Sequence, residues 1–161
     1  MANYYPMSNE LQELVDDTMA KDNPYLHTKG LDFVYLGVDK QSNIIQITKS
    51  SPLLNYIANK EEMIFVIIYE EAFEKLELDQ QKLIIANALN NIEYNDETDK
   101  TTIKKGGCGL DEGVYLRYRE KVVLSIFAGD HVIRQIEEAK KEEKKNSKKG
   151  KKNDSIYRGQ E

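Results

Sequence analysis

The spacing of apolar residues in the first half of the chain predicts one helix followed by strands. Leucine, valine and methionine recur at helical spacing up to Lys21, so we expect an amphipathic helix with Ser8 as its N-cap. Residues 31–38 and 43–49 are rich in β-branched and aromatic residues and flank a short polar loop, which is typical of a β-hairpin. Residues 62–70 are apolar on both alternating faces, which indicates a strand at the centre of the sheet.

A second amphipathic helix is predicted within residues 79–97, with Asp79 as its cap. Its buried stripe comprises Ile85, Ala88, Leu89 and Ile92. On a helical wheel, Asn87 and Asn91 lie about 40° apart on the flank of this stripe. We therefore expect both side chains to face a cleft or solvent, and not the deepest part of the core.

The pattern is less regular beyond this helix. Residues 94–113 are polar and end in a glycine-rich stretch, so we expect a long loop. The apolar residues of 114–118 alternate like those of a strand, whereas 119–129 fit a strand or a helix and stay open. A final helix is predicted to begin with Asp130 as cap and to fray into the lysine-rich end of the chain.

These elements predict an α+β fold with a small mixed sheet of three to four strands, an N-terminal helix, a central helix and a C-terminal helix. A chain of 161 residues is long enough for one domain with its own core. We expect a single globular domain over residues 1–138. Residues 139–161 form a lysine-rich tail that we expect to be disordered, because its low hydrophobicity cannot offset the entropy of ordering.

The charge distribution and the cysteine content limit the kinds of site and compartment that we expect for this chain. Residues 1–136 hold 14 Lys and Arg against 22 Asp and Glu, whereas residues 137–161 hold 9 against 6, so an acidic body carries a basic tail. The single cysteine, Cys108, permits neither an intramolecular disulfide nor a cysteine-based zinc site. No apolar run is long enough for a transmembrane helix and the first residues do not resemble a signal peptide, so we expect a cytoplasmic protein.

The order of strand, aromatic-containing turn and helix in IFVIIYEEAFEKLELDQQKLIIANALNN resembles the phage metallopeptidases, a minimal zincin-like family. In that family the same order leads into the zinc-binding motif HExxH. The resemblance covers residues 8–95 and rests on pattern and order, because the motif itself is absent. It implies a zincin-like central helix and a phage-encoded protein that acts in the host bacterial cytoplasm.

Carried over position by position, the two family histidines fall on Asn87 and Asn91, and the catalytic glutamate falls on Ala88. Carboxamide oxygen is a weak neutral ligand for zinc, and alanine cannot take a proton from metal-bound water. The resemblance therefore implies that hydrolysis is lost, and we expect no catalytic residue, no metal and no cofactor. The two asparagines are then either ordinary polar residues of a helix flank or residues that keep a cleft polar for a partner.

Other candidate sites are weaker. Cys108, Asp111 and His131 form a conceivable metal site, but their spacing does not support it, and His27 is distant in sequence. The stretch GGCGLDEG lacks the Gly-Lys-Ser/Thr of a phosphate-binding loop, so we interpret it as a flexible turn.

The basic tail is the remaining candidate binding site. Its lysines lie within thirteen residues: Lys140, Lys141, Lys144, Lys145, Lys148, Lys149, Lys151 and Lys152. Such a tract can neutralise phosphates and bind nucleic acid independently of sequence, or it can simply solubilise a frayed helix end. The acidic body opposes a broader nucleic-acid surface.

The leading hypothesis is a non-catalytic phage-encoded protein that binds or inhibits a host or phage macromolecular machine of replication, transcription or defence. Three alternatives stay open: a nucleic-acid accessory protein acting through the tail, a metallohydrolase with an atypical ligand set, and a virion structural component. The sequence names neither the partner nor the oligomeric state.

Overall fold

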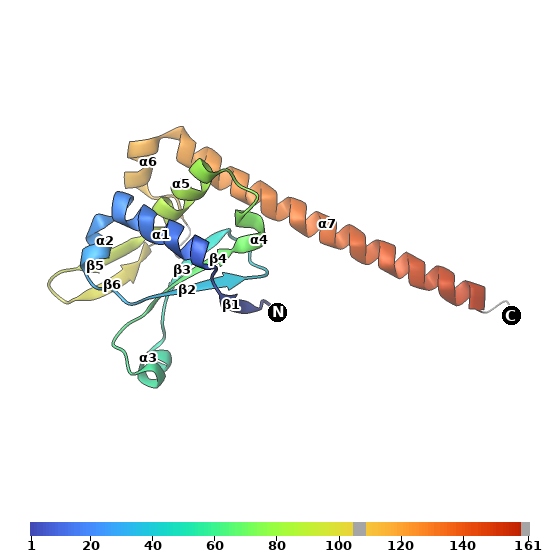
Figure 1. Ribbon diagram of the computed structural model, residues 1–161, viewed down its shortest axis with the longest axis horizontal. Helices are drawn as coiled ribbons and strands as arrows, with labels where there is room; N and C mark the ends of the chain where they lie inside the picture. The colour runs from blue at the N-terminus through green and yellow to red at the C-terminus, as the bar shows by residue number, and fades with distance from the viewer. Residues whose placement is uncertain (105–108, 159–161) are drawn as a thin grey trace.

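The fold is α+β, as the apolar spacing predicts. The computed structural model describes residues 1–104 and 109–158, with side chains described up to residue 150 except that of His27 (Figure 1). In chain order the elements are β1 (Tyr4–Pro6), α1 (Asn9–Asp22), α2 (Pro24–Thr28), β2 (Phe33–Val38), β3 (Ile45–Lys49), α3 (Pro52–Ala58), β4 (Ile64–Tyr69), α4 (Glu70–Phe73), α5 (Leu78–Leu89), β5 (Ile92–Asn95), β6 (Lys100–Ile103), α6 (Glu112–Tyr118) and α7 (Glu120–Arg158). Among the described residues, no helix combines the length and the apolar character needed to cross a bilayer.

The main sheet has four strands in the order β1-β2-β4-β3, and β4 occupies the predicted central position. The predicted hairpin between residues 31–38 and 43–49 is wrong, because β4 lies between β2 and β3. It pairs parallel with β2 and antiparallel with β3. Strands two places apart in a sheet are separated by about 10 Å, a gap that the short connection after Val38 can span. Because β4 is apolar on both faces, the central position buries it best.

The core joins one face of this sheet to α1, α5 and the first half of α7. The predicted helix after Ser8 is confirmed, and its apolar side is buried through Leu11, Val15, Thr18 and Met19. α5 packs against α1 and α7, and it also contacts the edge strand β3. The largest fully buried side chains come from the main sheet (Ile47, Ile64, Ile68), from α1 and α5 (Met19, Ile85, Leu89), and from α2, α4 and β5 (Leu26, Phe73, Ile92).

Three predictions for the second half of the chain are corrected. α5 begins earlier than predicted, because Glu77 and Gln80 form a capping box that places Asp79 in the first turn. The predicted long loop contains the antiparallel hairpin of β5 and β6. Residues 114–118 are part of α6 and not a strand, because the Asp111 side chain caps the Val114 N–H and starts a helix.

α7 includes most of residues 119–129, for which the sequence fits a strand or a helix, and it also includes most of the lysine-rich tail. Residues 119–129 are helical from Glu120 onward, so Asp130 lies inside α7 and does not cap it. We expected a disordered tail, whereas the structure continues α7 as one helix to Arg158, projecting from the body (Figure 1). The tail is rich in lysine and glutamate, which have high helix propensity, and this favours continuation of a helix already anchored in the core.

Candidate functional site

Asn87 and Asn91 are buried, so the expectation that they face a cleft or solvent is wrong. Asn87 is 4 % exposed and Asn91 is fully buried. Asn87 belongs to the last turn of α5, whereas Asn91 follows its C-cap residue, Asn90. The helical wheel misses the reason for their burial, because the segment that covers them comes from residues 109–111, further along the chain.

The two side chains clamp the backbone of residues 109–111. The Nδ2 atoms of Asn87 and Asn91 both donate to the Gly109 carbonyl oxygen, at 3.1 and 3.0 Å, and Asn87 Oδ1 accepts from the Asp111 N–H at 2.7 Å. Asn91 Nδ2 also donates to the Asn87 carbonyl oxygen at 3.1 Å. A carboxamide can satisfy a donor and an acceptor of a buried backbone at once, which an alanine cannot do. The amides therefore perform a structural task at the positions where the family resemblance implies metal ligands.

Asn90 extends this arrangement to the start of α6. Its Nδ2 donates to Asp111 Oδ2 at 2.9 Å, and its Oδ1 accepts from the buried Asn23 side chain. The same Asp111 oxygen caps α6 by accepting from the Val114 N–H at 3.0 Å. We call Asn87, Asn90 and Asn91, together with the 109–111 segment that they hold, the asparagine clamp.

The ionisation of Asp111 is tied to this clamp. Burial alone would raise the pKa of its carboxyl, but the hydrogen bonds from Asn90 and Val114 and the nearby Lys104 outweigh it, so the pKa lies below its ordinary value. Burial likewise opposes the charge of Lys104, yet its contacts with Asp111 and Glu93, at 3.3 and 3.5 Å, raise its pKa. Asp111 is therefore a charged structural residue and not a proton donor at neutral pH.

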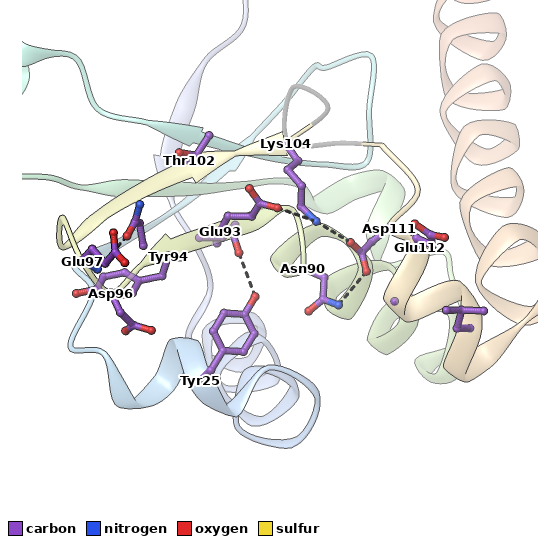
Figure 2. A pocket seen from close by; sticks show the side chains of 14 residues that line it. Tyr25, Asn90, Glu93, Tyr94, Asp96, Glu97, Thr102, Lys104, Asp111 and Glu112 are labelled. Atoms are coloured by element: carbon purple, nitrogen blue, oxygen red, sulfur yellow. Dashed lines mark hydrogen bonds and ion pairs between the residues drawn. The ribbon is translucent and has the colours of Figure 1, made fainter.

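A groove of about 1110 Å³ runs beside the clamp, between α2, the β5–β6 hairpin and the start of α6. Figure 2 shows Asn90, Asp111, Lys104 and Glu93 linked in one chain of polar contacts along its wall. The Tyr25 hydroxyl donates to the Ile92 carbonyl oxygen at 3.0 Å, and burial raises its pKa. The polar groups along this wall are thus engaged with one another.

The described side chains of this region do not form a metal site. In residues 1–104 and 109–150, apart from His27, no three His, Cys, Asp or Glu side chains are placed to share a metal ion. Ala88 is buried in the core, where it supplies no base. His131 lies exposed on α7, whereas Cys108 and the His27 side chain fall outside the described part of the chain, as do residues 106–108 of the glycine-rich stretch.

A second candidate surface is α3, which the sequence reasoning missed. None of its residues is buried, and Leu53, Leu54, Tyr56 and Ile57 are exposed, Tyr56 at 86 % and Ile57 at 70 %. Figure 1 shows α3 on the connection between β3 and β4, apart from the helices that cover the sheet. Large apolar side chains gathered in this way on a surface element mark an interaction site more often than chance exposure does.

The connection that carries α3 is fixed at its base. Ser50 and Met63 pair through their backbones at 2.9 Å, and Ser50 Oγ accepts a second bond from the Met63 N–H at 2.9 Å. Ion pairs of 2.7 Å join Lys49 to Glu62 and Lys60 to Asp32 on either side of this point. α3 therefore projects from an ordered support.

Local signals could have found this helix. Ser51 Oγ accepts from the Leu54 N–H at 3.2 Å, Pro52 occupies the first turn, and Asn59 ends the helix in the left-handed region with φ of 54°. This combination of N-cap, proline and asparagine is a recognised start and stop pattern. The segment SPLLNYIAN thus encodes a helix whose large apolar side chains are exposed.

The lysines of the tail lie on α7, and those described are exposed. Lys140 contacts the body, where its Nζ lies 3.4 Å from Glu71 Oε2 and 6.0 Å from the centre of the Tyr69 ring. Lys141, Lys144, Lys145, Lys148 and Lys149 have no side-chain partner among the residues that the structure describes. Lys151 and Lys152 belong to the final turns of α7, whose side chains are not described.

Comparisons of this chain with models of protein families, with curated proteins and with solved structures give no match. The resemblance to the phage metallopeptidases therefore stays a prediction.

Proposed function

We propose that this protein is a non-catalytic binding protein that engages another protein through α3. The observation that carries the proposal is the exposure of four large apolar side chains on a capped helix with a fixed base. Leu53 and Ile57 are four positions apart and therefore lie on one side of the helix, with Leu54 adjacent. Short helices of this kind place aliphatic and aromatic anchors into a groove of a partner.

The clamp supports the non-catalytic part of the proposal. Asn87 uses both polar atoms of its amide on the backbone of Gly109 and Asp111, and Ala88 offers no base. Purified protein is expected to carry less than about a tenth of an equivalent of zinc. A catalytic zinc would be bound at close to one equivalent, so an occupancy this low argues against one. Stoichiometric zinc together with a chelator-sensitive hydrolytic activity would contradict this part.

The resemblance to phage metallopeptidases supports a partner in the replication, transcription or defence machinery of a phage or its bacterial host. This part of the proposal depends on the resemblance alone. It is separable from the proposed role of α3, because α3 is a feature of the fold whatever the origin of the chain.

A photo-crosslinking amino acid at position 56 tests the role of α3 in cells that express the protein naturally. Tyr56 is the most exposed apolar residue of α3, so its replacement leaves the fold intact. We expect one dominant adduct with another protein, and no such adduct from a matched probe at Glu13, an exposed residue of α1. Equal adducts from both positions would contradict the proposal, and so would an adduct of two copies of this chain alone.

A further inference from the structure

The projecting part of α7 separates its charges onto two sides. At about 100° per residue, the six lysines of residues 140–150 fall within one half of the helix. The other half holds the remaining residues of this segment: Glu142, Glu143, Asn146, Ser147 and Gly150. A tract that only solubilises a helix end has no need of this separation. The lysine half, from Lys140 to Lys149, is here called the lysine face.

The lysine face is available to a partner. All side chains of residues 137–150 are exposed, and beyond Lys140 the face has no ion pair with any described residue. Figure 1 shows that this part of α7 extends well beyond the sheet and its covering helices. The projection moves the positive charge away from the acidic body, whose own charge repels polyanions.

The residue types on the two sides of this helix indicate which class of partner the lysine face can bind. A membrane-surface helix requires an apolar side to bury among the lipids, and residues 140–150 contain no apolar side chain. Lysines spaced along about 14 Å of helix match the closely spaced charges of a duplex, which carries one phosphate per about 1.7 Å of axis. We propose that the lysine face of α7 binds the phosphate backbone of a double-stranded nucleic acid without reading its sequence. The proposal is independent of the role of α3.

The test measures binding of the full chain to a labelled DNA duplex of about 20 base pairs by fluorescence anisotropy, between about 50 and 200 mM salt. One variant neutralises the face: Lys141→Gln, Lys144→Gln, Lys145→Gln and Lys148→Gln. A matched control keeps every charge but moves two lysines to the opposite side: K141E, E142K, E143K and K144E. Neither variant touches the body, so the free energy of unfolding is expected to stay the same.

The neutralised variant is expected to bind at least about tenfold more weakly at low salt. The slope of log affinity against log salt is expected to become shallower by about 3 to 4, since each lost phosphate contact removes about 0.9. The exchanged variant is expected to lose affinity by about the same factor as the neutralised one, although its net charge is unchanged.

Three outcomes would overturn the proposal. Equal affinity of the neutralised variant and the natural chain would exclude the lysine face as the contact. Full affinity of the exchanged variant would show that the charge acts without a helical face. Binding to vesicles of anionic phosphatidylserine, with no binding to the duplex, would assign the face to a membrane.

Discussion

At the C-terminal end of α5, three asparagines turn inward, and two of them are fully or almost fully buried. In α3 the reverse holds, because leucine, isoleucine and tyrosine side chains face solvent and none is buried. Both polar atoms of the Asn87 amide bond backbone groups of Gly109 and Asp111, whereas the four large apolar side chains of α3 are exposed among the residues that the structure describes. Side chains that look like remnants of a catalytic site thus stabilise the fold, and binding is better sought on the element that leaves its apolar side chains uncovered.

Removal of the clamp is expected to have the largest effect on stability. Asn87→Ala leaves the buried Asp111 N–H without an acceptor and removes one donor to Gly109. We expect a loss of about 2–4 kcal/mol in the free energy of unfolding, measured by urea denaturation. Asn146→Ala makes the same chemical change on the exposed part of α7 and is expected to have an effect within about 0.5 kcal/mol. Equal stability of the two variants would show that the clamp does not support the fold.

Asp111→Asn is expected to have the next largest effect, about 1–2 kcal/mol at neutral pH, because it replaces the charged cap of α6 and weakens the contact with Lys104. The folded-state pKa of Asp111 is depressed, so its contribution is present above the unfolded value near pH 4 and is lost as the pH falls through the folded value. The difference between variant and natural chain is therefore expected to shrink in acid, as measured by unfolding across pH.

A matched substitution separates Asp111 from general charge effects. Asp17→Asn removes a carboxylate from the exposed side of α1, where no hydrogen bond to another described side chain holds it. Its effect on the free energy of unfolding at neutral pH is expected to be within about 0.5 kcal/mol. A pH profile of Asp111→Asn that runs parallel to that of Asp17→Asn would contradict the role given to Asp111.

Truncation after Lys141 tests whether the projecting part of α7 contributes to the stability of the body. It removes residues that are exposed throughout their described part and spares the contact of Lys140 with Glu71. The free energy of unfolding is expected to change by less than about 0.5 kcal/mol. Circular dichroism is expected to lose the helical signal of the removed segment. A large loss of stability would show that the tail packs against the body.

The smallest stability effect is expected from α3 itself. Leu53→Ser with Ile57→Ser exchanges exposed apolar side chains for polar ones, so the free energy of unfolding is expected to change by less than about 0.5 kcal/mol. Chemical denaturation checks this value. A loss above about 2 kcal/mol would mean that α3 packs against the fold and is not a free surface.

Elements with a clear local pattern could be predicted from the sequence. The helix after Ser8 and the central position of β4 are confirmed, because amphipathic spacing and a doubly apolar strand report burial directly. The neighbours of β2 and β3 could not be predicted, because strand pairing depends on a third segment that lies later in the chain. The hairpin of β5 and β6 was missed because most of its residues are polar, although Thr101 is buried.

The burial of Asn87 and Asn91 could not be predicted from α5 alone, the helix that contains Asn87 and ends just before Asn91. A helical wheel describes one helix, whereas the clamp is closed by residues about twenty positions later. Asp111 gave a usable signal, since an aspartate three residues before Val114 is a common N-cap pattern. The alternation of Val114, Leu116 and Tyr118 misled because Leu116 is exposed while Val114 is buried.

The role of α3 is tested most directly by the dissociation constant of the partner captured through position 56. The natural chain and the Leu53→Ser, Ile57→Ser variant are compared, with the free energy of unfolding measured on the same samples. We expect the variant to bind at least about 30-fold more weakly, which corresponds to about 2 kcal/mol, while its stability is unchanged. Equal affinity of the two proteins would contradict the proposal that α3 is the surface through which this protein binds.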